Sequence, residues 1–258
     1  MRAIIVAAGL GSRLAPYTDD RPKALVDVNG RSILRRQIEA YRDAGVDEIC
    51  VVRGWQGERV TAAEPGLRYF DNPDFRRNNI LASMFFAEPA MEGGFFFSYS
   101  DIVFRPEIVR ALADVPAEVD YALVIDRRFA DVYEGRDLHP IGEAELADVR
   151  RGPDGLTVRA LGKRVVPTAE AHGEFIGLAR FSARAAEIMR REYRAIEARL
   201  GPEAPFGTAK RFASAYLTDL LNHLIGMGEI MRSVDIDGGW REIDTTQDYE
   251  RALALVDW

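Results

Sequence analysis

Small residues and cations gather near the start of the chain, directly after its first apolar run. They are Ala8, Gly9, Gly11, Ser12, Arg13 and Lys23. Glycines let the backbone turn sharply and approach a ligand closely, and a turn of exposed N–H groups can hold phosphate oxygens. An arginine adds a two-pronged donor, and a lysine adds a compact charge. The segment therefore predicts a binding site for a triphosphate.

The spacing of these residues excludes two common phosphate loops. A Walker loop needs a lysine next to its second glycine, whereas Lys23 lies well beyond Gly11. The dinucleotide pattern G-x-G-x-x-G needs a third glycine where Leu14 stands. A Gly-x-Gly pair alone is equally compatible with a plain turn, so the prediction depends on the whole string around it.

Two aspartates stand where they could hold a metal ion. Asp101 ends the apolar run 95–100, and Asp244 precedes a helix opened by a capping-box pattern at 245–248. Ligands of open α/β sheets bind at the carboxyl ends of strands, and Mg²⁺ prefers a few carboxylates together with water. Each aspartate alone is explained as well by a turn or a helix start. Beside a triphosphate loop, the pair predicts a Mg²⁺ site.

Apolar runs and amphipathic segments predict the elements that position these residues. Strands are expected at 3–6, 49–52, 67–70, 95–99, 121–125 and 230–236, and helices at 106–112, 183–200 and 212–225. A further helix is expected between Ser32 as N-cap and Gly45 as stop. Strand, helix and strand in this order form a right-handed βαβ unit. We therefore expect residues 1–258 to form one α/β domain with a Rossmann-like, mostly parallel sheet and flanking helices.

Residues from about 127 to 180 depart from this pattern. The segments 143–150, 156–161 and 175–181, with a turn at Pro153-Asp154-Gly155, read as a β-meander. We expect this β-rich insertion to shape a pocket for a second substrate. Arg127 and Arg128 follow the strand at 121–125, again at a carboxyl end, and are candidates to line that pocket.

Composition excludes several classes of function. The 258-residue chain is 47% hydrophobic and 29% charged, as in ordinary globular proteins, and its net charge of −7 argues against a general nucleic-acid binder. The single cysteine, Cys50, excludes a disulfide within the chain, and the three histidines lack metal-ligand spacing. The apolar run 4–10 is too short to span a membrane. A cytoplasmic protein without nucleic-acid or membrane partners is expected, and a homodimer is compatible with the sequence.

Two segments resemble those of a known family. Ala-Ala-Gly-Leu-Gly-Ser-Arg-Leu at 7–14, then Pro-Lys-Ala-Leu-Val at 22–26, resembles the signature of the sugar-phosphate nucleotidylyltransferase superfamily. Asn-Asn-Ile-Leu-Ala-Ser-Met at 78–84 resembles the Asn-Asn-x-x-Ser-Leu segment of its phosphocholine cytidylyltransferase-like branch, with Met84 in place of leucine. The resemblance covers nearly the full length and is weaker between 127 and 220. It implies the nucleotide-diphospho-sugar transferase fold.

The resemblance also implies a role for each matching residue. The triphosphate would be held by Ala8, Gly9, Gly11, Ser12, Arg13 and Lys23, and the nucleobase would lie against Asn79 and Ser83. Asp101 and Asp244 match the family's metal aspartates and, with Arg13 and Lys23, would carry catalysis. Lys163 would meet the phosphate of the acceptor, and Glu174 matches a substrate-binding acidic position.

The implied reaction is a Mg²⁺-dependent transfer of CMP from CTP to a phosphonate or phospho-alcohol, releasing pyrophosphate. Phosphocholine would need an aromatic cage, for which Phe129, Tyr133 and Tyr216 are candidates, with Asp219 as an anion. The flanking stretch is rich in arginine and lacks tryptophan. This favours a small or anionic head group, as in aminoethyl-, hydroxyethyl- or carboxyl-bearing phosphonates, over phosphocholine.

Two alternatives stay open. A sugar-1-phosphate nucleotidyltransferase would use another nucleoside triphosphate, but the region around Asn79 lacks the paired small residues common in sugar-specific relatives. A non-catalytic nucleotide-sensing subunit would tend to lose the lysine or a metal aspartate. This chain keeps Lys23, Asp101 and Asp244.

Overall fold

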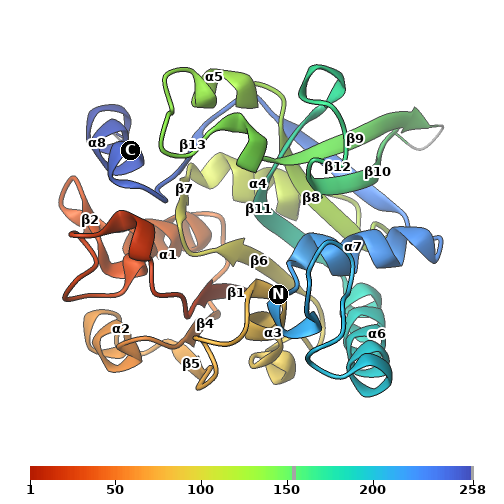
Figure 1. Cartoon of the computed structure of the whole chain (residues 1–258), viewed down its shortest axis with the longest axis horizontal. Coiled ribbons are helices and arrows are strands. Elements are labelled where there is room, and N and C mark those ends of the chain that lie inside the picture. Colours follow the sequence, from red (N-terminus) through yellow and green to blue (C-terminus); the bar gives the residue numbers. More distant parts are fainter. Residues whose placement is uncertain (153–154, 257–258) are drawn as a thin grey trace.

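A mixed β-sheet runs through the centre of the molecule (Figure 1). The structure is a computed structural model that describes residues 1–152 and 155–256. Within these residues the sheet has nine strands in the order β5-β4-β1-β6-β11-β8-β12-β10-β9. The strands are β1 (Arg2–Ala7), β4 (Ile49–Arg53), β5 (Arg68–Asp71), β6 (Phe95–Tyr99), β8 (Tyr121–Asp126), β9 (Glu145–Gly152), β10 (Gly155–Lys163), β11 (Gly173–Phe181) and β12 (Met231–Ile236).

The first half of the sheet is parallel, as expected for βαβ units. β1 pairs in parallel with β4 and β6, and β4 pairs in parallel with β5. The helix α1 (Ile33–Asp43) lies in the connection from β1 to β4. At its start the hydroxyl of Ser32, the predicted N-cap, accepts a hydrogen bond from the Arg35 N–H. The central strands β1, β4 and β6 are mostly apolar because both of their faces are covered, whereas the edge strand β5 is partly exposed.

The second half of the sheet contains more antiparallel pairing than the sequence predicts. β11 runs antiparallel between β6 and β8, and the β9–β10 hairpin joins the sheet through β12. Residues 173–181 therefore belong to the centre of the sheet, and only the hairpin extends it. Of the turn predicted at Pro153-Asp154-Gly155, the first two residues lie outside the described part of the chain.

Helices cover both faces of the sheet (Figure 1). Besides α1 they are α2 (Gly57–Ala63), α3 (Ile80–Phe85), α4 (Pro106–Ala113), α6 (Ala183–Leu200) and α7 (Leu217–Gly226). The helices α5 (Phe129–Tyr133) and α8 (Thr246–Leu255) pack in two smaller clusters. The helices predicted at 106–112 and 183–200 are confirmed, whereas the one predicted at 212–225 begins at Leu217. Asp219 causes this late start because its carboxylate accepts a hydrogen bond from the backbone N–H of Tyr216, capping the helix there. The sequence analysis did not predict the short helices α2, α3 and α5.

Alternate residues of each central strand enter opposite halves of the core. Ile4 packs in the cluster that includes residues of α3, α6 and α7, while Ile5 packs in the cluster that includes residues of α1 and α4. Both side chains are fully buried. Burying one such side chain contributes roughly 1.5–3 kcal/mol to folding. In the described part of the chain, no helix is long and apolar enough to cross a membrane.

Candidate active site

A cleft of about 380 Å³ opens at the carboxyl ends of β1 and β6. It lies where open α/β sheets bind their ligands. Its lining includes most of the predicted site residues: Ala8, Gly9, Gly11, Ser12, Arg13, Lys23, Asn79, Ser83, Asp101, Lys163, Glu174 and Asp244. The structure therefore brings together in one cleft segments that are far apart in the sequence.

The glycine-rich loop follows β1 directly and forms one wall of the cleft. Gly11 has a φ of +65°, and a Cβ atom there would lie 2.7 Å from the Cβ atom of Lys23. A larger residue would therefore be strained and would displace the lysine. A Cβ atom on Gly9 would meet no described atom within 4 Å, so the backbone at Gly9 is open to a ligand.

Lys23 lies between the two predicted metal aspartates. Its Nζ atom donates to Asp101 Oδ2 at 2.9 Å and to Asp244 Oδ1 at 2.6 Å. Burial opposes the charge of Lys23, but the two carboxylates outweigh burial and raise the pKa of the lysine. Lys23 is therefore a charged group held at the floor of the cleft.

A two-stranded ladder brings Asp101 and Asp244 to the same place. β7 (Ile102–Phe104) pairs antiparallel with β13 (Trp240–Glu242), and Ile102 lies opposite Glu242. The N–H of Ile243 then donates to the carbonyl of Asp101 at 2.7 Å. The ladder thus joins the residue before Asp244 to Asp101, although the two aspartates are distant in the sequence.

The carboxylates fit a divalent cation. Asp101 Oδ1 is buried and has no hydrogen-bond partner among the described residues, so a hard oxygen is available to a ligand. Asp244 is almost fully buried, and burial opposes its charge. The hydrogen bond with His139 and the charge of Lys23 outweigh burial and hold the pKa of Asp244 well below its usual value. Asp244 is therefore ionised at neutral pH, as a metal ligand must be.

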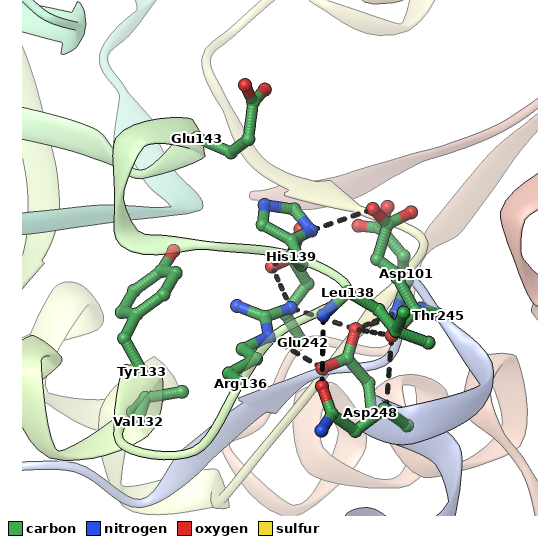
Figure 2. A network of polar contacts seen from close by, with 12 residues as sticks. Asp101, Val132, Tyr133, Arg136, Leu138, His139, Glu143, Glu242, Thr245 and Asp248 are labelled. Atoms are coloured by element: carbon green, nitrogen blue, oxygen red, sulfur yellow. Dashed lines mark hydrogen bonds and ion pairs between the residues drawn. The ribbon is translucent and has the colours of Figure 1, made fainter.

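A second set of polar residues surrounds Asp244, and the sequence analysis did not include it in the site. Figure 2 shows His139, Glu242 and Arg136 beside the start of α8. His139 Nδ1 lies 2.9 Å from Asp244 Oδ2, and Arg13 lies 2.8 Å from the same oxygen. Ligand atoms of His139, Glu242 and Asp244 lie within 4.8 Å of one another, so His139 and Glu242 are also placed to hold a cation.

The residues predicted to contact the nucleobase, Asn79 and Ser83, also line the cleft. Asn79 precedes α3, and its side chain donates to the carbonyl of Ser214 at 3.2 Å. The hydroxyl of Ser83 accepts a hydrogen bond from Asn72 at 2.8 Å. Both side chains are thus fixed by hydrogen bonds to neighbouring residues.

Lys163 and Glu174, which were predicted to bind the acceptor, also line the cleft. Lys163 forms an ion pair of 2.7 Å with Glu143 and sits 5.5 Å from the centre of the Tyr216 ring. Tyr133 donates to Glu174 Oε1 at 2.6 Å, while Glu174 Oε2 is buried without a partner among the described residues. Burial raises the pKa of Glu174 to about 8. A third carboxylate in this region, Glu145, was missed by the sequence analysis.

Three of the predicted substrate residues lie elsewhere. Arg127 and Arg128 are exposed and do not line the cleft, and Arg128 pairs with Asp131 at 2.6 Å. They turn away because Asp126, the last residue of β8, points inward and accepts a hydrogen bond from Trp240. Asp219 is buried, and its oxygens accept from Thr208 and from the Tyr216 N–H. Arg127 and Arg128 therefore do not support the predicted preference for an anionic head group.

These features together define a nucleotidyltransferase: a glycine-rich loop, a buried lysine and two aspartates at one edge of an α/β sheet. The chain belongs to the family with a MobA-like NTP transferase domain, which matches residues 3–187. It is similar to the CTP:phosphoglutamine cytidylyltransferase of Campylobacter jejuni, with 30% identity over 97% of this chain and 98% of that protein. The 2-aminoethylphosphonate cytidylyltransferase of Lancefieldella rimae is 37% identical over 41% of this chain and 44% of that protein. These relatives confirm the predicted cytidylyltransferase-like branch.

Solved structures confirm the predicted fold. The CTP:phosphocholine cytidylyltransferase from Streptococcus pneumoniae superposes with a TM-score of 0.70 at 20% identity, covering 99% of both chains. The inositol-1-phosphate CTP transferase from T. maritima superposes with a TM-score of 0.73 at 21% identity, covering 97% of this chain and 94% of that one. At this level of identity the similarity concerns the fold alone.

Proposed function

We propose that this chain transfers CMP from CTP to a small acceptor bearing a phosphate or phosphonate, with Mg²⁺ as cofactor and pyrophosphate as leaving group. The observation that carries the proposal is Lys23, held between Asp101 and Asp244 beside the open glycine-rich loop. The names of its relatives, which act on phosphoglutamine and 2-aminoethylphosphonate, support CTP as donor and a phosphorylated acceptor.

The donor half of the reaction follows from the loop and its cations. Backbone N–H groups near Gly9 and Gly11 would hold phosphate oxygens, and Arg13 and Lys23 would neutralise their charge. Asp101 and Asp244 would hold Mg²⁺, which when bound screens the repulsion between the two substrates and stabilises charge at the α-phosphorus. Lys23 contacts both aspartates, so it is placed to remain beside the phosphates during transfer.

The acceptor half needs positioning more than proton transfer. The attacking phosphate or phosphonate oxygen is already anionic, so holding it in line with the α-phosphorus is the main requirement. Lys163 lines the cleft and would bind this anionic end. Glu174, with one oxygen fixed by Tyr133 and the other free, would form a hydrogen bond with the acceptor.

The two alternatives differ from this proposal in what they require. A sugar-1-phosphate acceptor would present several hydroxyl groups, and a nucleotide sensor would bind CTP without turnover. The acidic lining formed by Glu143, Glu145 and Glu174 favours an acceptor that carries a positively charged amino group over a sugar, whose hydroxyl groups are uncharged. Retention of Lys23, Asp101 and Asp244 favours an enzyme over a sensor.

A matrix assay tests the proposal. Pyrophosphate release is measured with CTP, UTP, GTP or dTTP against phosphoglutamine, 2-aminoethylphosphonate, 2-hydroxyethylphosphonate, phosphocholine and glucose-1-phosphate, with and without EDTA. We expect release only with CTP and a non-sugar acceptor, and loss of release with EDTA that returns when Mg²⁺ is added. Turnover restricted to glucose-1-phosphate, or binding of CTP without release for every acceptor, would contradict the proposal.

A further inference from the structure

Glu145 lines the cleft, and the function proposed above uses it only as one part of the acidic lining. It is the first residue of β9, and the sheet register places it directly opposite Lys163 on β10. Both side chains line the cleft. Directly opposed residues of antiparallel strands have Cβ atoms about 4.5–5.5 Å apart. One short ligand can therefore contact both of them.

The carboxylate of Glu145 is held in place by hydroxyl groups. Tyr99 donates to Oε2 at 2.9 Å, and Thr218 donates to Oε1 at 3.3 Å. An ionised carboxylate can accept about four hydrogen bonds, so each oxygen keeps capacity for a ligand. Two fixed hydroxyls leave the carboxylate oriented and only partly satisfied.

No cation of the described residues forms an ion pair with Glu145. Its cross-strand neighbour Lys163 pairs instead with Glu143, at 2.7 Å. Glu145 is half-buried, and a carboxylate partly removed from water without a paired cation is costly. Burial raises the pKa of Glu145 to about 7. A ligand that brings its own positive charge would remove this cost.

We propose, on the basis of the function proposed above, that Glu145 makes the enzyme select acceptors whose head group is a primary ammonium. The anionic end of such an acceptor lies at Lys163, and its ammonium donates to Glu145 across the short distance between β9 and β10. A primary ammonium offers three donors and a charge, whereas a hydroxyl offers no charge and a quaternary ammonium offers no donor. Quaternary ammonium groups are bound by aromatic cages instead.

A matched acceptor pair tests this proposal. 2-Aminoethylphosphonate and 2-hydroxyethylphosphonate differ only in the head group, and phosphocholine supplies the quaternary ammonium. Values of kcat/KM are measured for all three with wild type, Glu145→Gln and the control Glu170→Gln, which changes an exposed carboxylate outside the cleft. The KM for CTP and the melting temperature of each protein are measured alongside.

We expect wild type to prefer the aminoethyl acceptor by about tenfold to a hundredfold, the range for a hydrogen bond to a charged group. Glu145→Gln should remove most of this preference by lowering kcat/KM for the aminoethyl acceptor alone. It should leave the KM for CTP unchanged, and Glu170→Gln should behave as wild type.

Other results would overturn the proposal in distinguishable ways. An equal loss for all three acceptors in Glu145→Gln would make Glu145 a structural residue and leave the cytidylyl transfer intact. If the wild-type enzyme preferred the hydroxyethyl acceptor or phosphocholine, the proposed selection of a primary ammonium would be wrong. This test uses the wild-type protein alone and does not depend on the folding of any variant. Absence of pyrophosphate release with CTP and every acceptor would remove the proposed function itself.

Discussion

Arg136 holds the carboxylate of Asp248 through two hydrogen bonds, of 2.6 and 2.9 Å (Figure 2). The same carboxylate accepts from the backbone N–H groups of Asp244 and Thr245, at 3.1 and 2.8 Å. Arg136 also donates to Glu242 at 2.7 Å. The backbone that carries Asp244 is thereby fixed to the loop that carries His139.

Replacement of this arginine should affect both stability and metal use. Arg136→Ala leaves the buried carboxylate of Asp248 and the half-buried one of Glu242 without their cation, which should destabilise the protein by about 3–5 kcal/mol. Arg136→Lys keeps the charge but not the two-pronged geometry, and we expect it to fold and to need more Mg²⁺ for half-maximal activity. Urea unfolding and Mg²⁺ titration of activity measure the two effects. Arg110→Ala, at an exposed ion pair with Glu107, is the control and should change neither.

Asp101 and Asp244 should be required for turnover but not for the fold. We expect Asp101→Asn and Asp244→Asn each to lower kcat by at least about a hundredfold, because each removes a charged oxygen from the metal site. Pyrophosphate release gives kcat, and circular dichroism checks the fold. Asp114→Asn, at an exposed helix end, is the matched control. Near-normal turnover in either active-site variant would defeat the assignment.

Stability of the ligand-free protein should fall as the pH rises from about 5 to 8. Burial raises the pKa of Glu174 to about 8, so the folded protein keeps a proton that the unfolded chain loses above its ordinary pKa of 4.5. A raised pKa contributes stability at low pH that is lost as the pH rises through the folded value, at most about 1.4 kcal/mol per pH unit. Glu145, with a pKa of about 7, acts in the same direction.

Urea unfolding at several pH values between 5 and 8 measures this slope. Glu174→Gln cannot ionise, so its slope should be shallower than that of wild type. Glu170→Gln removes an exposed carboxylate and should leave the slope unchanged. Identical slopes in wild type and Glu174→Gln would show that Glu174 ionises normally in the folded protein.

The two glycines of the loop should respond differently to alanine. Gly11→Ala introduces a Cβ atom 2.7 Å from that of Lys23 at a φ of +65°, so we expect a loss of more than about 1 kcal/mol in stability. Gly9→Ala meets no described atom within 4 Å, so its melting temperature should match wild type while its KM for CTP rises. Thermal melts and CTP titrations separate the two effects. A normal KM in Gly9→Ala would place the phosphates elsewhere.

Local sequence signals were sufficient to predict that the glycine-rich loop, Asp101 and Asp244 lie at one cleft. Gly9, Gly11 and Asp101 directly follow buried strands, and the carboxyl end of a strand is where a ligand binds whatever the rest of the chain does. The capping box that begins α8 likewise identified the position of Asp244. In each case the residues that define the position are neighbours in the sequence.

The rest of the cleft depends on long-range pairing that no local pattern reports. His139 meets Asp244, and Arg136 meets Asp248, only because a loop after α5 folds against the start of α8. Glu145 faces the cleft because of the register between β9 and β10. A shift of one residue would turn its side chain to the other face of the sheet. Arg127 and Arg128 follow the carboxyl end of a strand, which is where ligands usually bind. They nevertheless lie outside the cleft because the side chain of Asp126 points inward, to Trp240, and the chain after it turns away.

The ladder between β7 and β13 has a consequence for how the enzyme is made. Asp244 reaches Asp101 only when β13 pairs with β7, and β13 leaves the ribosome well after β7. A nascent chain that has emerged only as far as β11 already contains the glycine-rich loop, Lys23 and Asp101, but it lacks Asp244. The proposed metal site can therefore form only after β13 has been synthesised, and a product terminated at β11 would lack one of its two proposed aspartates.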